Sequence, residues 1–236
     1  MTRTVLVPVA LIALAGCSGP LSTLQPGGPV AGHIALLWWV MLLGAAGLTL
    51  MVVMLVALGF RGPREVQARV WTHGLGIWFS LVVLSGTLAV GLWVGERILP
   101  RDDGAVVVEA HAVQWSWHFT HEDAAGNRVG SVDVLHIPAG VPVDVLITSE
   151  DVIHSFWVPQ LAGKMDAIPG RTNRARIIAD APGRYAGLCA EFCGLHHAGM
   201  RFDVQAHADW PPAPEEDVPD EDAPDEDAPE EDTPDE

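Results

Sequence analysis

The sequence predicts a membrane-anchored protein of the α+β class, with an N-terminal two-helix transmembrane hairpin followed by a C-terminal β-sandwich or barrel. Three observations predict this fold. Two long uncharged runs, at residues 34–60 and 71–94, each exceed the ~20 residues that cross a bilayer. From about residue 105, short β-branched runs alternate with turn signals. Hydrophobic residues make up 49% of the 236-residue chain, a high share for a soluble protein.

The N-terminus has the pattern of a bacterial export signal. Arg3 provides the positive end of residues 1–16, and a short apolar stretch follows it. Small residues then precede Cys17, as in the lipobox of bacterial lipoproteins, whose processing would acylate Cys17 as the mature N-terminus. A plain signal peptide with a chance cysteine is the alternative. Residues 17–32 are rich in Gly, Pro and Ser and are predicted to form a linker.

The two uncharged runs belong to a predicted hairpin over residues 33–98. Three arginines, Arg61, Arg64 and Arg69, lie in the short segment between the runs. Because such loops stay in the cytoplasm, both chain ends are expected outside, in agreement with an exported N-terminus. This orientation predicts a multi-pass protein of the bacterial plasma membrane with a periplasmic C-terminal domain. Two buried soluble helices are the alternative, which the length of the uncharged runs disfavours.

Charge divides the rest of the chain. The net charge is −17, but residues 211–236 contain 14 Asp and Glu and no Lys or Arg, so the body is nearly neutral. Because this tail has no core-forming residues, residues 209–236 are predicted to be a disordered acidic tail. The acidic balance argues against binding to nucleic acid, which needs a basic surface.

The β domain is expected over residues 99–208. Short β-branched runs at this spacing, separated by Pro-Gly and Ala-Gly turn signals, indicate a sandwich or barrel of about 100 residues. The predicted strands are at 106–108, 132–137, 143–148 and 175–178.

Potential metal ligands cluster near the end of this domain. Cys189 and Cys193 are four residues apart, His197 follows four residues later, and Met200 three residues after that. Soft thiolate and thioether ligands favour copper, whereas zinc prefers closed sets of Cys and His. His154 can complete the site if the sandwich folds it back.

Simpler interpretations exist for each ligand taken singly. Cys189 and Cys193 could form a disulfide, because the domain is exported. His196 or His207 could be a surface histidine, and Met200 a core residue. The combined spacing in one exported β domain favours the metal site.

Further segments accompany the metal-binding string in a defined order. They are the two-helix hairpin, Gln114–Trp117 (Gln-Trp-Ser-Trp), Asp151–Phe156 (Asp-Val-Ile-His-Ser-Phe) and Lys164–Arg171 (Lys-Met-Asp-Ala-Ile-Pro-Gly-Arg). With these segments and the metal-binding string, residues 33–207 resemble subunit II of the haem-copper oxidases, in the form that carries the dinuclear copper centre CuA. The resemblance implies a cupredoxin-like fold for the sandwich.

The resemblance also implies the ligand roles. Cys189 and Cys193 would bridge both coppers through their sulfurs. His154 and Met200 would complete one copper.

The second copper would be completed by His197 and by the backbone carbonyl of Glu191. The Glu191 carboxylate would hold a magnesium ion shared with subunit I. His196 is then a neighbour of the site, because the family spacing places the ligand four residues after the second cysteine.

The implied function is the electron-input subunit of an aa3-type-like cytochrome c oxidase, working with subunits I and III. Electrons from cytochrome c would reach CuA and pass to haem in subunit I, where oxygen is reduced and protons are pumped, so no catalytic residue is expected in this chain. Trp115 matches the aromatic residue at which electrons arrive; a core tryptophan is the alternative, which fits Trp117 better. Glu150 and Asp151 match acidic positions that dock cytochrome c, a role for opposite charge.

The chain departs from the family at the start of the second helix. Many relatives have a glutamate there that admits protons to a channel of subunit I. Here the nearest titratable group is His73. Either the proton entrance differs, or His73 takes part in proton uptake, or another residue serves instead, and His73 could also simply be solvated. The chain also lacks the Cys-x-x-Cys-His haem motif of some fused subunits, so no haem c is expected.

Three other functions compete. A quinol oxidase subunit II has the same hairpin and sandwich but lacks the copper ligands. A copper-delivery protein usually binds through fewer, more exposed ligands. A nitrous-oxide reductase domain belongs to a larger soluble chain, against which the hairpin argues.

Overall fold

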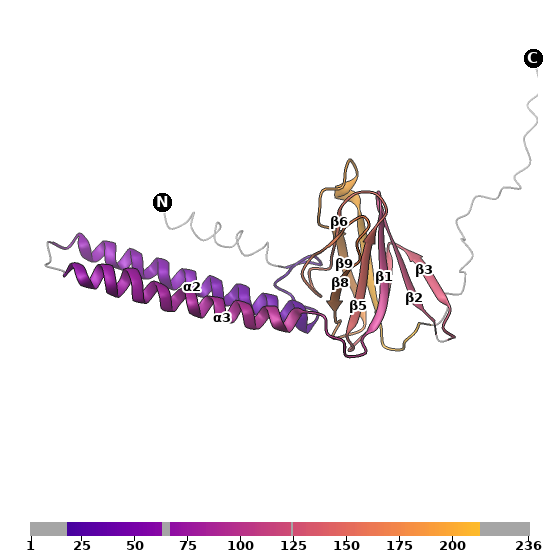
Figure 1. Cartoon of the computed structure of the whole chain (residues 1–236), viewed down its shortest axis with the longest axis horizontal. Coiled ribbons are helices and arrows are strands. Elements are labelled where there is room, and N and C mark those ends of the chain that lie inside the picture. The colour runs from indigo at the N-terminus through magenta and orange to yellow at the C-terminus, as the bar shows by residue number, and fades with distance from the viewer. Residues whose placement is uncertain (1–17, 63–66, 124, 213–236) are drawn as a thin grey trace, which may run out of the picture.

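The structure, a computed structural model, describes residues 18–62, 67–123 and 125–212 and places a long helical hairpin beside a β-sandwich (Figure 1). The first helix is α2 (Pro29–Gly59). The second begins as a π-helix, η2 (Val70–Phe79), and continues as α3 (Ser80–Ile98). The export signal, Cys17 and nearly all of the acidic tail lie outside the described residues.

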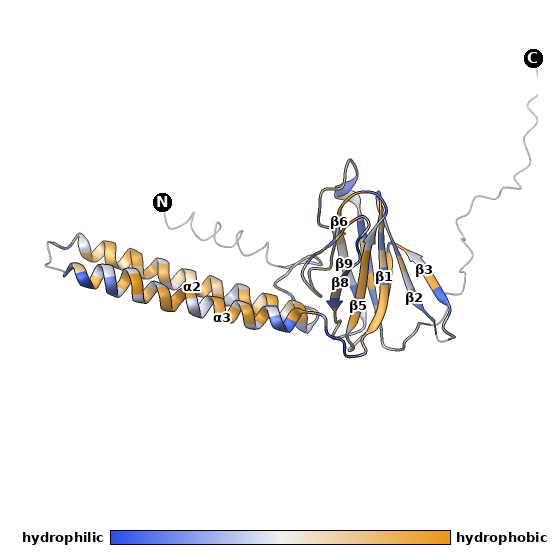
Figure 2. Cartoon of the chain, in the orientation of Figure 1, coloured by the Kyte–Doolittle hydropathy of each residue, from blue (hydrophilic) through white to orange (hydrophobic). Residues whose placement is uncertain are grey.

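Both helices are long and apolar enough to cross a membrane. Their most hydrophobic windows are wholly unburied by the rest of the protein, and apolar residues cover most of their length (Figure 2). The 31 residues of α2 extend about 46 Å at 1.5 Å per residue, more than the ~30 Å of a hydrocarbon core. Each helix is longer than its uncharged run predicts. Pro29, in the first turn of α2, suits a helix start because a proline there loses no hydrogen bond.

The predicted linker is partly docked on the β domain. The Gly27 amide donates to the Gln160 carbonyl at 2.7 Å, and the Ala31 amide donates to the Leu161 carbonyl at 3.1 Å. Gly28 lies so close to the sandwich that a Cβ there would be 1.8 Å from the Ile178 carbonyl oxygen. Gly27 and Gly28 therefore permit a close backbone approach here. Helix α2 already begins within the predicted linker.

The β domain consists of two five-stranded sheets, in agreement with the predicted sandwich. Sheet A has the order β3-β2-β1-β5-β8, and sheet B has the order β4-β10-β9-β6-β7. Each sheet contains one parallel pair, β1 with β5 and β4 with β10. The strands are β1 (Val106–Val113), β2 (Ser116–Glu122), β3 (Arg128–Val132), β4 (Val134–Pro138), β5 (Val143–Ser149), β6 (His154–Trp157), β7 (Met165–Ala167), β8 (Asn173–Ile177), β9 (Gly183–Cys189) and β10 (Arg201–His207).

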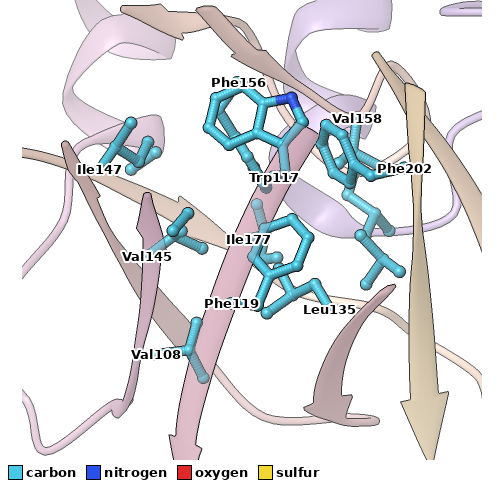
Figure 3. Close-up of a cluster of buried hydrophobic side chains, with 14 of the residues drawn as sticks. Val108, Trp117, Phe119, Leu135, Val145, Ile147, Phe156, Val158, Ile177 and Phe202 are labelled. Atoms are coloured by element: carbon cyan, nitrogen blue, oxygen red, sulfur yellow. The ribbon is translucent and has the colours of Figure 1, made fainter. Parts of the chain in front are cut away.

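An aromatic cluster fills the core between the sheets (Figure 3). Trp117, Phe119, Phe156 and Phe202 are almost fully buried, with ring centres 4.9–6.3 Å apart in stacked, tilted and edge-on contacts. Trp117 is the core tryptophan that the sequence favoured. Trp115 lies in the turn between β1 and β2 and is only partly buried.

A charged network joins the end of the hairpin to the sandwich. The buried Asp144 on β5 accepts hydrogen bonds from Arg174 and Arg176 of β8. Arg176 also donates to Asp103 at 2.7 Å and to the Arg101 carbonyl at 2.6 Å, in the segment that follows α3. Because buried charges are stable only when paired, this network holds the exit of the second helix against one face of sheet A.

The network predicts that Asp144→Asn lowers the free energy of unfolding by about 2 kcal/mol, because Arg176 loses its buried charge partner and keeps only the half-exposed Asp103. Burial alone would raise the pKa of Asp144, but the hydrogen bonds from Arg176 and Arg174 outweigh burial and hold the pKa below its usual value. The stabilisation is therefore complete above the unfolded-state pKa of about 3.9 and is lost as the pH falls through the lower folded-state pKa. Denaturant unfolding of the detergent-solubilised chain as a function of pH measures this free energy of unfolding.

The exposed Arg128–Glu109 pair offers a matched control. Glu109→Gln is expected to change the free energy of unfolding by less than ~1 kcal/mol, because exposed ion pairs contribute little. Equal losses in the two variants would contradict a special role for the buried network.

Candidate metal centre

The pairing of β6, β9 and β10 brings the separated ligand residues together at one end of sheet B. Phe156 pairs with Cys189, so the start of β6, at His154, lies beside the end of β9. The Ala190 amide donates to the Ser155 carbonyl at 2.9 Å, and the Cys189 amide donates to the Met200 carbonyl at 3.0 Å. The segment between Cys189 and Met200 is therefore a loop closed at its base by backbone hydrogen bonds.

Every side chain predicted to bind copper lies in this cluster. The Cys189 and Cys193 sulfurs are 3.8 Å apart, and the Cys189 sulfur is 3.8 Å from His154 Nδ1. The Cys193 sulfur is 3.6 Å from His197 Nδ1 and 3.7 Å from Met200 Sδ.

The one predicted backbone ligand lies in the same cluster. The Glu191 carbonyl is 3.2 Å from the Cys189 sulfur. Separations of about 3–4 Å are those of donors that each lie ~2.0–2.3 Å from a shared ion.

The two cysteines are free thiols rather than a disulfide. Their sulfur separation of 3.8 Å is well beyond the ~2.05 Å of an S–S bond, so the disulfide alternative does not describe this site. Burial, and next the nearby Cys189, raises the pKa of Cys193 to about 12. A metal ion that binds here must therefore displace the Cys193 proton, since the ligand is the thiolate.

The donor set suits copper. Cys189, Cys193, His154 and Met200 are each buried, which leaves thiolate, imidazole and thioether donors in an apolar surrounding. Soft sulfur donors select copper over harder cations. Five side chains and one carbonyl exceed the four ligands of one tetrahedral ion. The residues present therefore fit copper.

A carboxylate holds His154 in its orientation. Asp151 Oδ1 lies 2.8 Å from His154 Nε2, which leaves His154 Nδ1 facing Cys189. Asp151 also accepts from the backbone amides of Val152 at 2.6 Å and Gln114 at 2.8 Å. Burial would raise the pKa of Asp151, but these hydrogen bonds outweigh burial and keep the pKa below its usual value. Carboxylates behind a ligating histidine fix its tautomer and direction.

The sequence prediction for Asp151 named partner docking alone. The carboxylate three residues before His154 was the available signal, but only the folded turn shows that the two side chains meet. Glu150, the other predicted docking residue, has a different neighbour. Its side chain is 71% exposed and contacts His111 Nε2 at 3.4 Å.

Gln114 and Trp115 form a bridge between the two ligand segments. The Gln114 side-chain amide donates to the Cys193 carbonyl at 2.6 Å. The Trp115 ring contacts the His196 ring edge-on, with centres 4.6 Å apart. A Cβ on Gly194 would come within 3.3 Å of the Trp115 ring, so this glycine permits the close approach. His196 thus contacts Trp115, while its neighbour His197 faces Cys193.

The Glu191 carboxylate points away from the sulfurs. It accepts a hydrogen bond from Lys164 at 3.0 Å, and Lys164 also contacts Asp166. The predicted magnesium ligand is thus a half-exposed acid at the rim of the site.

Comparison with known protein families gives a match over the part of the chain that contains this site. The family model described as cytochrome c oxidase subunit II, periplasmic domain, matches residues 126–207, which include all of the predicted copper ligands. The chain belongs to the cytochrome c oxidase subunit II family. The two long apolar helices and the family's periplasmic domain make it a membrane protein whose C-terminal domain is periplasmic.

Two curated relatives are subunit 2 of cytochrome c oxidase. The chain is 35% identical to the one from Synechocystis over 58% of this chain and 43% of the relative. It is 32% identical to the one from Alkalihalophilus pseudofirmus over 87% of this chain and 65% of the relative. The matches thus cover less than two thirds of these subunits' own length.

The chain is also similar to a quinol oxidase subunit and to a solved periplasmic domain. A quinol oxidase subunit 2 from Bacillus cereus is 28% identical over 85% of this chain and 74% of the relative. Among solved structures, the periplasmic domain of cytochrome oxidase subunit II from Bradyrhizobium japonicum is 30% identical, covering 48% of this chain and 89% of that chain with a TM-score of 0.42.

Asp151→Asn is expected to weaken copper binding by about 10–100-fold, the range for a lost partner of a ligating histidine. The amide replaces one of two acceptor oxygens, so either His154 or the Gln114 backbone loses its hydrogen bond. Competition with a copper chelator, using the full chain in detergent, measures the affinity. Glu150→Gln is the matched control, and an equal loss in that variant would contradict the role of Asp151.

Proposed function

We propose that this chain is the electron-input subunit of an aa3-type-like cytochrome c oxidase. It accepts electrons from cytochrome c at CuA and delivers them to haem in subunit I, where oxygen reduction is coupled to proton pumping. The convergence of two cysteines, two histidines, a methionine and a backbone carbonyl within one loop and one strand end carries this proposal.

The ligand residues suit electron transfer rather than bond-making chemistry. When bound, a dinuclear copper centre held by these six groups supplies a one-electron relay. Strand ends and backbone hydrogen bonds hold Cys189, His154 and Met200 in place, so the ligand shell is preorganised. Asp151 keeps the His154 ring from turning. Burial of both cysteines excludes water from the sulfurs.

Trp115 is proposed as the residue at which electrons arrive. It is partly exposed, and the neighbouring Gln114 is hydrogen-bonded to the Cys193 carbonyl, a direct connection to a copper ligand. Exposed apolar side chains surround this end of the domain, with Phe192 at 77% and Leu195 at 89% exposure. Together with the exposed Glu150, they suit a partner that is basic at its rim and apolar at its contact centre.

A quinol oxidase subunit II is the second candidate, because a relative with that function aligns over most of the chain. Such subunits lack the copper ligands. In this chain all six groups are present and gathered, which favours the cytochrome c oxidase.

Other features of the proposal concern the rest of the complex. Magnesium would bind the Glu191 carboxylate together with groups of subunit I, and subunit III completes the assembly. Both helices would span the plasma membrane, with Cys17 as a lipid anchor. His73 lies in the π-helix η2, and π-helical segments are frequent at functional sites. We keep His73 as a candidate group for proton uptake near the cytoplasmic surface.

Copper loading of the full chain in detergent tests the centre. We expect two coppers per chain and a seven-line EPR signal from one unpaired spin shared equally between two copper nuclei. Cys193→Ser is expected to abolish this signal, because one of the two sulfur bridges is lost. Retention of the two-copper signal in Cys193→Ser would refute the ligand assignment.

Neighbouring histidines provide a matched pair for the same spectrum. His197→Asn is expected to change the EPR signal, whereas His196→Asn is expected to preserve it, because His196 contacts Trp115 rather than a sulfur. A single copper with a four-line signal in the unaltered chain would instead indicate a mononuclear copper protein.

Trp115→Ala is expected to slow reduction by cytochrome c about tenfold or more, while the copper EPR signal is preserved. Trp115 is the proposed point of electron arrival and a partly exposed aromatic residue of the kind that dominates interface energetics. A loss of ~1.4 kcal/mol in the interaction with cytochrome c corresponds to a tenfold change. Stopped-flow reduction of the purified oxidase at low ionic strength measures it. An unchanged rate would remove Trp115 from the electron path.

A further inference from the structure

A second group of potential metal ligands lies at the other end of the sandwich. His121 on β2, His136 on β4 and His207 on β10 meet there, and we call these residues the histidine cluster. Strand β10 runs from Arg201, beside Met200, to His207. At ~3.3 Å per residue, the histidine cluster therefore lies about 20 Å from the copper ligands and shares none of them.

Two of the three imidazoles are already at ligand spacing. His136 Nδ1 and His207 Nε2 are 2.9 Å apart, and their stacked rings have centres 5.2 Å apart. Two nitrogens that each lie ~2.1 Å from one ion are about 3 Å apart when they occupy adjacent positions. A metal ion can therefore take the place of the proton that lies between the two nitrogens in this contact.

The third imidazole is close enough to join them. The His121 and His136 ring centres are 5.8 Å apart, slightly more than the ~5 Å of imidazoles on one ion. In the described part of the chain, the ligand atoms of His154, Cys189 and Cys193 already lie within 4.8 Å of one another. The three rings of the histidine cluster are not yet that close together. Metal binding at the histidine cluster thus requires the His121 ring to move closer to the other two rings.

The surroundings of the cluster favour a neutral, metal-binding imidazole. Burial lowers the pKa of His121, and His207 lowers it further, against the opposing charge of Asp123. Neutral imidazole is the ligating form. His121, Asp123 and Trp210 also line one groove, and the Trp210 ring covers His121 with centres 5.2 Å apart. A cation would meet a nearby carboxylate and a partly desolvated site.

We propose that His121, His136 and His207 form a mononuclear binding site for a divalent transition-metal ion of the Zn²⁺ or Cu²⁺ type. Imidazole nitrogen suits these borderline ions. The site joins the two sheets, because β2 belongs to sheet A and β4 and β10 belong to sheet B. Metal binding would therefore hold the sandwich closed at the end where the acidic tail begins.

The test uses the full chain in detergent with Cys189→Ser and Cys193→Ser, so that thiolate ligands are absent and the result is independent of the proposed copper centre. Zn²⁺ is titrated and followed by calorimetry. We expect one ion per chain and a rise of roughly 10 °C in the unfolding midpoint at about 100 times Kd. His136→Ala and His207→Ala should each weaken binding about tenfold or more.

Two controls separate the alternatives. His118→Gln alters an exposed histidine on the same strand as His121 and should leave Zn²⁺ binding unchanged. His136→Gln and His207→Gln repeat the test with less change of volume, in case an alanine variant fails to fold. Absence of Zn²⁺ binding in the parent chain overturns the proposal. So does binding that survives both histidine substitutions but disappears when residues 213–236, with their many carboxylates, are deleted.

Discussion

The antiparallel pairing of β6 with β9 is the constraint on which the candidate metal centre depends. It sets Phe156 opposite Cys189, and the positions of the candidate metal ligands at the ends of these strands follow from that register. A shift by one residue would turn every side chain of β6 to the other face of the sheet, which would take His154 away from the cysteines and put Phe156 outside the core. The aromatic core of Trp117, Phe156 and Phe202 opposes such a shift, so core packing and ligand placement support each other.

Asp151 shows how a single carboxylate connects several parts of the site. It contacts the ring of His154 and the backbone of Gln114, while the Gln114 side chain contacts the Cys193 carbonyl. The hydrogen bonds thus lead from one ligand segment to the other through the turn that carries Trp115. Such rigidity would suit the proposed electron transfer, because ligands that move little require little reorganisation.

The hairpin and the sandwich are also joined by more than a flexible connection. The Gly27–Gly28 segment lies against the β domain before α2, and Asp103 contacts Arg176 after α3. Both ends of the hairpin are therefore tied to the sandwich, which fixes the position of the candidate metal centre relative to the hairpin.

The sequence by itself determined the two apolar helices, the β-sandwich and the turn glycines at 140, 170 and 183, which all have positive φ. It also singled out the candidate ligands around Cys189 and Cys193. These features depend on local periodicity, turn chemistry and spacing within one loop. Only the tertiary structure decided that Asp151 supports His154, that Gly27 and Gly28 dock on the sandwich, and that His121, His136 and His207 meet. The docked glycines and the three histidines contact residues far away in the chain, so these contacts depend on strand order and packing. The Asp151–His154 contact depends on the shape of the turn before β6. A local sequence pattern encodes neither.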